Sequence, residues 1–128
     1  MQGRLTASSK LDFFPFHNWE HEFPAARRIG FDAIEWGFAT EGWEKNPILA
    51  KNGIEKIEYL IGKNYIAIPS ICGYYFINHG FVGEKAKNNI KILNQLIQAG
   101  AQIGAKRILI PFLGKSEIKN ENEKNGIK

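Results

Sequence analysis

The chain has 128 residues, 44% of them hydrophobic and 23% charged, which is the composition of one globular domain. Its single cysteine, Cys72, excludes an internal disulfide framework, and no apolar run approaches the roughly 20 residues that a membrane-spanning helix needs. Lys and Arg number 17 against 13 Asp and Glu, a net charge of +4, but they form no basic run, which disfavours a nucleic-acid-binding face. No apolar leader follows Met1, so we expect a cytoplasmic protein without a membrane partner.

The N-terminal part is predicted to form two strands and one helix. Residues 2–7 are a short candidate strand. Asn18 is a candidate N-cap for a helix over residues 19–29, and Gly30 is expected to end this helix because glycine adopts the left-handed conformation without a Cβ clash. Residues 31–36 are expected to form the next strand. The apolar helix face is expected to consist of Trp19, Phe23, Ala26 and Ile29.

Two further helix–strand pairs are predicted. A capping-box spacing at residues 52–55 opens a helix that Gly62 is expected to end. An apolar strand over residues 65–71 comes next. The longest helix is expected over residues 84–103, and a strand over residues 107–112 follows it. The apolar stripe of this long helix is expected to consist of Ala86, Ile90, Leu93, Ile97 and Ala101.

One motif marks the helix-to-strand boundaries. The pattern Ile-Gly-x-x-x-Ile begins at residues 29, 61 and 103, so its copies are 32 and 42 residues apart. A repeated unit of one helix and one strand is typical of βα units with parallel strands. The connections that follow the strands are long, aromatic and polar. Because ligands of parallel sheets bind at the carboxyl ends of the strands, we expect the working face at these loops.

The composition divides the chain into two regions. Residues 1–114 are expected to form a partial α/β barrel of four parallel βα units. Residues 115–128 are polar, with two apolar residues among fourteen, and are interpreted either as a polar tail or as the start of an incomplete fourth βα loop and helix.

Five segments carry a resemblance to a known family: Met1-Gln2-Gly3-Arg4-Leu5, Asn18-Trp19-Glu20-x-Glu22-Phe23, Ile29-Gly30-Phe31-Asp32-x-Ile34-Glu35-Trp36, Ser70-Ile71-Cys72 and Arg107-Ile108-x-Ile110-Pro111-Phe112. They resemble the N-terminal half of sugar phosphate isomerases/epimerases of the xylose isomerase-like TIM-barrel superfamily. The resemblance implies the first four strands of a (β/α)₈ barrel. A whole barrel needs roughly 250 residues, so the chain is expected to be a fragment or a half-barrel.

This resemblance implies a function for the parent family rather than for these residues alone. The family abstracts a proton next to a carbonyl with a carboxylate base, and a divalent metal (Mn, Mg, Zn or Co) polarises the carbonyl. The family's metal ligands and acid/base carboxylates lie on later strands, so none is assigned to this chain. The expected role here is the substrate-side wall for a sugar or sugar phosphate, and whether the chain alone is an enzyme stays open.

The candidate substrate-binding residues lie at predicted strand ends and in the loops that follow them. Arg4 suits a phosphate or carboxylate, and Glu35 suits a sugar hydroxyl. Each also has a structural interpretation: a rim ion pair for Arg4 and Glu35, packing for the aromatic side chains and Cys72, and plain surface exposure for the histidines. The full candidate set is Arg4, His17, Glu35, Trp36, Cys72, Tyr75 and His79.

Two other functions remain as alternatives. An endonuclease IV-like DNA-repair enzyme shares the superfamily, and Tyr75-Phe76-Ile77-Asn78 resembles its segment after the third strand. Cys72 stands where that enzyme has a metal-binding histidine, which makes this alternative and nucleic-acid binding disfavoured. The other alternative is a non-catalytic half-barrel that forms a homodimer or pairs with a missing barrel half, because an open parallel sheet leaves edges that invite another chain.

Overall fold

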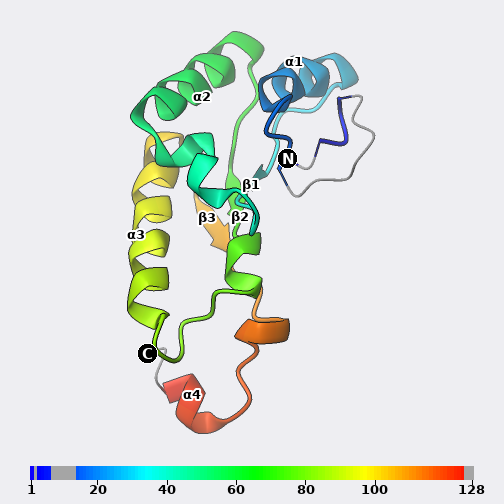
Figure 1. Ribbon diagram of the computed structural model, residues 1–128. Coiled ribbons are helices and arrows are strands. Elements are labelled where there is room, and N and C mark those ends of the chain that lie inside the picture. Colours follow the sequence, from blue (N-terminus) through cyan, green and yellow to red (C-terminus); the bar gives the residue numbers. More distant parts are fainter. Residues whose placement is uncertain (2, 7–13, 126–128) are drawn as a thin grey trace.

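The computed structural model describes residues 1, 3–6 and 14–125 (Figure 1). One sheet contains three parallel strands in the order β1 (Trp36–Gly37), β2 (Ser70–Cys72) and β3 (Arg107–Leu109). The helices between and beyond them are α1 (Trp19–Ile29), α2 (Lys51–Asn64), α3 (Ala86–Gln102) and α4 (Glu121–Asn125). Short 3₁₀ turns lie in the connections: η1 (Trp43–Lys45), η2 (Pro47–Leu49), η3 (Tyr74–Ile77) and η4 (Gly114–Ser116). The predicted α/β class with parallel βα units is confirmed, as an open sheet consistent with part of a barrel.

The described part of the sheet has three strands, where the sequence predicted four. Residues 3–6 bend instead of extending, because Gly3 has a φ of +69° and packs against Pro15. The predicted strand over residues 2–7 is therefore wrong for these four residues, while residues 2 and 7 lie outside the described part.

Helix α1 has the predicted bounds, but its N-terminal cap and one residue of its apolar face differ from the prediction. Gly30 ends the helix in the left-handed conformation, with a φ of +97°, as predicted. The Asn18 side chain makes no capping hydrogen bond. Ile29 is 57% exposed instead of belonging to the apolar face. The residues that follow, 30–33, are exposed as well, so the end of α1 and the start of the connection to β1 lie outside the core.

Helix α2 extends past both residues that were expected to bound it. It begins at Lys51, so Asn52 lies inside the helix and is not its cap. It also continues through Gly62 and ends at Asn64, and Tyr65 adopts the left-handed conformation with a φ of +54°. The predicted Gly62 stop is wrong, because the chain turns three residues later at a residue with a side chain.

Helix α3 buries a different face from the predicted stripe. Ile90 and Ile97 are 45% and 52% exposed, so this part of the prediction is wrong. The helix is rotated so that Asn89 enters the core, where it makes two hydrogen bonds. A polar residue can occupy a core position when its hydrogen bonds are satisfied there, which an apolar-periodicity argument overlooks. The buried positions of α3 are Asn89, Ile92, Leu96, Ala99 and Gly100.

The segment that leads into β2 contains a bulge next to Pro69. Ala33 pairs with Ala67 and Trp36 pairs with Ile71, so three steps along one strand lie opposite four along the other. The extra residue changes which side chains face the helices, and Pro69, which has no N–H to donate, is tolerated at such a site. The side chains buried on either side of the bulge are Ile66, Ile68 and Ile71.

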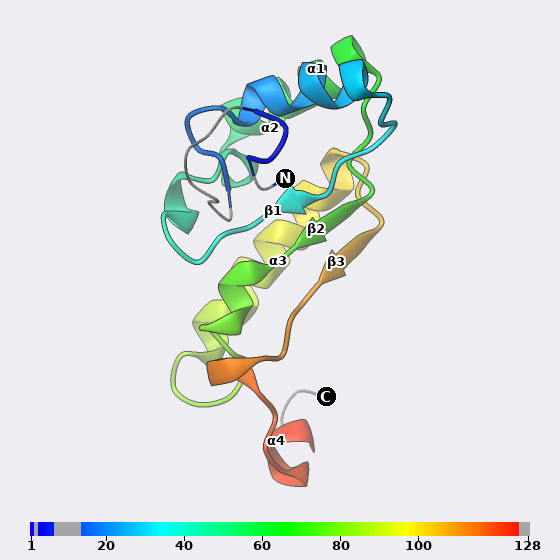
Figure 2. The same cartoon turned by 90° about the vertical axis from the view of Figure 1, so that its right-hand side faces the viewer.

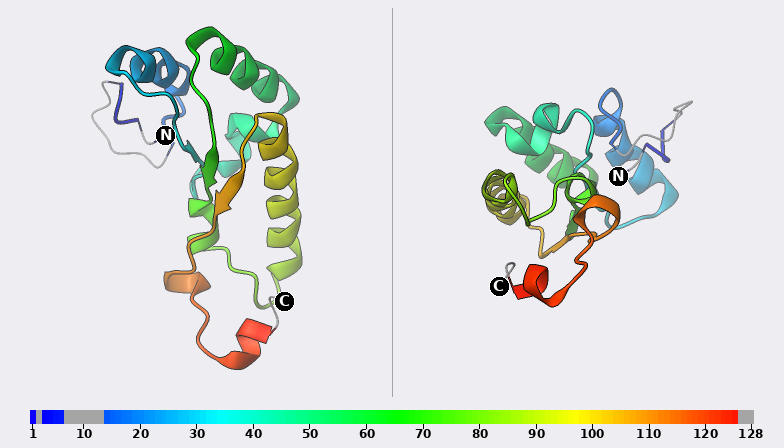
Figure 3. Two further views of the ribbon diagram at one scale, coloured as in Figure 1. Left: turned by 180° about the vertical axis from the view of Figure 1, so that it is seen from behind. Right: turned by 60° about the horizontal axis from the view of Figure 1, so that its bottom comes forward.

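The core lies between the helices and one face of the sheet. In Figure 2 the strands lie in front of α3, and none of the described helices crosses in front of them. Trp36 and Ile71 face the helices and are fully buried, so Glu35 and Ser70, which precede them, face the open side. Figure 3 shows that η3, η4 and α4 follow the carboxyl ends of the strands, at the opposite end of the molecule from α1. This end is where the sequence placed the working face.

Candidate functional site

Three polar side chains form a row across the open face of the sheet. Ser70 Oγ donates a hydrogen bond of 2.8 Å to Oε1 of Glu35, which directly precedes β1. Ser70 pairs in register with Arg107 of β3, so Arg107 extends the row on the same face. The sequence singled out Glu35 but missed Ser70 and Arg107. Knowledge of the strand register would have identified Ser70 and Arg107, but the bulge at Pro69 shifts that register by one residue.

Arg4 and Glu35 are brought into one cavity of about 300 Å³ beside β1. Glu22 of α1 and Tyr74 also line it. The Glu22 carboxylate is buried and accepts a hydrogen bond of 2.6 Å from Thr6 Oγ1. Since Arg4 shares this cavity with two carboxylates, its positive charge is balanced locally, which weakens the case for phosphate binding at this position.

Three of the candidate residues are buried in the core. Trp36 is fully buried, and its indole N–H donates a hydrogen bond of 3.0 Å to Oδ1 of Asn46. Tyr75 and Cys72 are only 2% and 3% exposed. Substrate contact by these three side chains stays a prediction. Their observed contacts agree with the alternative role in packing that the sequence analysis gave for them.

The surroundings of Cys72 favour the protonated thiol. Burial raises the pKa of the thiol, the negative charge of Glu35 adds to the rise, and a hydrogen bond with Tyr74 opposes it. A thiolate is the nucleophilic form of cysteine, so this environment suits a packing role better than a nucleophilic one.

The two histidine candidates have different surroundings. His17 is exposed in the turn before α1 and does not line the cavity beside β1. His79 is half-buried and lines a larger cavity of about 760 Å³. This carboxyl-end cavity lies between the loop after β2 and the loop after β3. Its lining residues are Asn78, His79, Gly80, Phe81, Val82, Glu84, Lys85, Asn89, Lys115, Ser116, Glu117, Lys119 and Glu123.

His79 is fixed by contacts with Tyr75 and, through it, with α3. The two rings are stacked with their centroids 3.9 Å apart and an angle of 4° between their planes. His79 Nδ1 lies 2.8 Å from the Tyr75 carbonyl oxygen. The Tyr75 hydroxyl donates to Oδ1 of Asn89 at 3.2 Å, and Asn89 Nδ2 donates to the Gly80 carbonyl at 2.7 Å. Burial, and then the charge of Glu44, raises the pKa of Tyr75, so its hydroxyl remains a donor.

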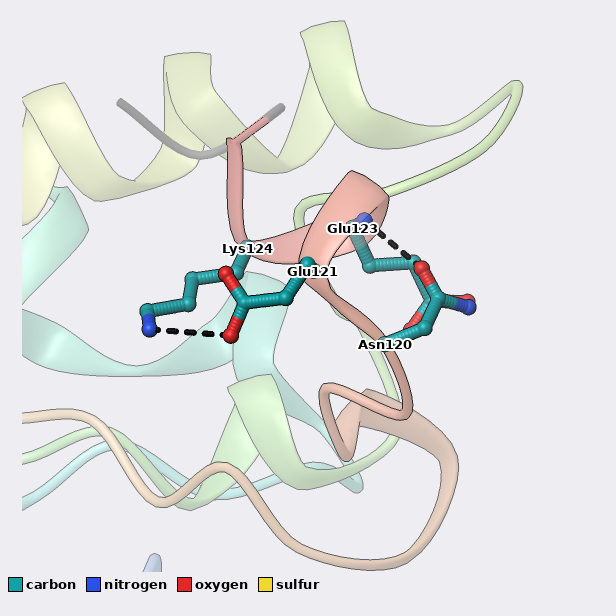
Figure 4. Close-up of polar contacts among 4 residues, drawn as sticks. All are labelled: Asn120, Glu121, Glu123 and Lys124. Carbon is teal, nitrogen blue, oxygen red and sulfur yellow. Dashed lines mark hydrogen bonds and ion pairs between the residues drawn. The ribbon is translucent and has the colours of Figure 1, made fainter.

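The other wall of the carboxyl-end cavity is built by η4 and the start of α4. Ser116 is buried against Gly80, where an added Cβ would lie 3.2 Å from the Ser116 Cα. Asn120 Oδ1 accepts a hydrogen bond of 3.0 Å from the Glu123 N–H (Figure 4). The Glu123 carboxylate in turn accepts one of 2.7 Å from the Lys119 N–H. These reciprocal contacts form a cap that fixes the loop at the cavity edge.

The described residues do not by themselves form a metal site. Among them no group of three or more His, Cys, Asp and Glu side chains lies close enough together to hold an ion. The row on the open face offers one carboxylate and one hydroxyl, which is too few ligands for Mg²⁺, Mn²⁺ or Zn²⁺. We therefore assign no metal ligand to these residues.

The geometry defines an α/β protein of parallel βα units with polar cavities beside its strands. The chain is 30% identical over 100 residues to 3-dehydro-D-guloside 4-epimerase from Escherichia coli (strain K12). The match covers 77% of this chain and 34% of the relative, so the chain spans about a third of the length of the curated relative it matches. No family model matches the sequence. The comparison shows distant similarity to a sugar epimerase. Among the described residues, no helix is long and apolar enough to cross a membrane.

Proposed function

We propose that this chain forms the substrate-side wall of a sugar isomerase/epimerase of the xylose isomerase-like superfamily. The single observation that carries the proposal is the carboxyl-end cavity, which lies between two consecutive βα loops. Loops at this end of a parallel sheet form binding sites. The distant similarity to a sugar epimerase supports a sugar as the occupant, either free or phosphorylated.

The proposed reaction of the parent protein moves a proton next to a carbonyl. A carboxylate base outside the described residues would remove the proton, and a divalent metal bound by the parent protein would supply charge stabilisation. Within this chain, His79 and the Glu35–Ser70 pair are proposed to bind and orient hydroxyl groups. We assign no acid or base to the described residues.

The test is a binding experiment on the whole chain. Uniformly ¹⁵N-labelled protein is titrated with an uncharged glycoside, a sugar phosphate and a duplex containing an abasic site. We expect a sugar to shift the amide resonances of residues 78–89 and 113–123. Shifts caused by the duplex alone, and weakened strongly by salt, would instead support the endonuclease-like alternative. The absence of any sugar-induced shift would contradict the proposal.

The exposed edge of β3 favours a second candidate, a half-barrel that binds another chain. Leu109 of β3 is 56% exposed, and Leu113 just beyond it is 61% exposed. Ile97 on the neighbouring helix α3 is 52% exposed. β3 is the last strand in the described sheet, and the backbone of an edge strand can pair with a further strand.

Light scattering after size-exclusion chromatography tests this second candidate. A dimer that Ile97→Lys converts to a monomer would support it. A wild-type monomer across the concentration range would count against a homodimer. Lys91→Glu, which changes an exposed charge on the same helix, is the matched control.

A further inference from the structure

One nitrogen in the carboxyl-end cavity is left as a hydrogen-bond acceptor. A carbonyl oxygen can only accept, so the 2.8 Å contact between Tyr75 O and His79 Nδ1 requires the hydrogen to be on Nδ1. In the neutral ring, Nε2 is then unprotonated. Within the described residues Nε2 has no protein partner. The imidazole is therefore an acceptor at a site where a ligand could supply the donor.

The surroundings of His79 leave the Nε2 edge of its ring without a protein partner among the described residues. One face of the ring is covered by Tyr75 at a centroid distance of 3.9 Å, and Nδ1 is occupied by the backbone. His79 lines the carboxyl-end cavity, and the ring atoms that remain for a ligand there are those of the other face and of the edge that carries Nε2. Tyr75 is 2% exposed and is itself held by Asn89, so it is a fixed platform for the imidazole. Turning the imidazole would break its stacking on Tyr75 and its part-buried Nδ1 contact. A fixed acceptor of this kind favours binding, because little side-chain entropy is lost when the ligand binds.

The charges around the carboxyl-end cavity balance. Three lysines and three glutamates line it, so it has no surplus of either sign. The Glu123 carboxylate already accepts the Lys119 N–H. A dianionic phosphate would face the glutamates as well as the lysines, whereas an uncharged ligand rich in hydroxyl groups would meet donors and acceptors without a net repulsion. The lining residues of each sign are Lys85, Lys115 and Lys119 against Glu84, Glu117 and Glu123.

We propose that the carboxyl-end cavity binds an uncharged polyhydroxylated sugar, and that Nε2 of His79 accepts a hydrogen bond from one of its hydroxyl groups. This inference rests on the proposed function and narrows it, because it selects free sugars or glycosides over sugar phosphates. Tyr75 and Asn89 act as positioning residues. The Tyr75 carbonyl fixes the tautomer and its ring stacks on the imidazole, while Asn89, which also lines the cavity, holds the Tyr75 hydroxyl.

The first test measures the tautomer directly. A long-range ¹H–¹⁵N correlation spectrum of the whole chain distinguishes the two ring nitrogens. We expect His79 to carry its hydrogen on Nδ1 when neutral. An Nε2–H tautomer would overturn the inference even if a sugar binds, because the proposed acceptor would then be a donor.

The second test measures binding by matched variants. The probes are methyl β-D-glucopyranoside, which is uncharged, and glucose 6-phosphate. His79→Asn keeps an N–H that can reach the Tyr75 carbonyl but lacks an atom equivalent to Nε2, and we expect it to weaken glycoside binding about tenfold, the effect of one lost hydrogen bond. His79→Gln, whose longer side chain can place an oxygen near the lost Nε2, is expected to restore part of the affinity. His21→Asn, on the exposed side of α1, is the control.

Each outcome separates the inference from the proposed function. Equal glycoside binding by wild type and His79→Asn would overturn the inference but leave sugar binding in place. Sugar-induced shifts confined to residues outside 78–123 would have the same two consequences. Glucose 6-phosphate binding more than about tenfold tighter than the glycoside would overturn the uncharged-ligand assignment. If neither probe shifts any resonance, the proposed function and the inference fail together.

Discussion

Two glycines of helix α2 are expected to respond to alanine in opposite directions. Alanine favours an exposed helix interior over glycine by about 1 kcal/mol. Gly62 has nothing within 4 Å of where a Cβ would lie, so Gly62→Ala gains this amount. At Gly53 the same atom would overlap the Pro47 carbonyl oxygen and lie 2.7 Å from the carbonyl carbon. Overpacking costs about 1–3 kcal/mol, and here the neighbour is backbone that no rotamer change can move. We expect Gly53→Ala to lose about 2 kcal/mol net.

Thermal and urea unfolding followed by tryptophan fluorescence measure both variants. For a chain of this size, 1 kcal/mol corresponds to about 4 °C in Tm. The Tm of Gly62→Ala should therefore be about 4 °C higher than that of the wild type, and the Tm of Gly53→Ala about 8 °C lower. Equal rises for both variants would refute the reasoning, because they would mean that α2 and η2 are not in contact at Gly53. A fall for both would mean that α2 does not continue through Gly62.

Three further predictions concern the core and the site. Asn46→Ala removes three buried hydrogen bonds, to the Trp36 indole, a carbonyl and an amide, so we expect urea unfolding to show a loss of about 3 kcal/mol in stability. The control Asn94→Ala changes an exposed asparagine and should alter stability by less than about 0.5 kcal/mol. Similar losses for the two variants would contradict the buried role of Asn46. Leu96→Ala should lower the free energy of unfolding by about 3 kcal/mol and Ile97→Ala by less than about 1 kcal/mol, because their side chains are 0% and 52% exposed. The reverse order would mean that α3 buries the face predicted from periodicity. The pKa of Cys72 is raised by burial, so the unfolded thiol ionises first as the pH rises past about 8.5. The contribution of Cys72 to the free energy of unfolding should therefore be fully present below that pH and be lost above it. Cys72→Ala should flatten the dependence of stability on pH between pH 7 and 9.5. An unchanged slope would show that other groups cause the loss.

The match between sequence and structure is closest where local chemistry decides. Gly30 ends α1 because a left-handed turn is needed there and glycine adopts it at little cost. The apolar run before β2 also predicted the burial of Ile66 and Ile68, although Ala67 between them is exposed. At Gly62 the same glycine argument fails. Helix α2 is held by η2 on one side and continues until Tyr65, so the tertiary contact decides where the helix ends.

The candidate site divides in the same way. The sequence by itself determined the α/β class, the parallel order of the βα units and the end of the sheet where the long loops gather, because these follow from periodicity and from the lengths of the connections. Only the tertiary structure decided which side chains reach a cavity. The bulge at Pro69 aligns Glu35 with Ser70, and the rotation of α3 brings Asn89 into the core, where it holds Tyr75 and so orients His79. Strand register and helix rotation depend on the summed packing of residues far apart in the chain, so no local pattern specifies them.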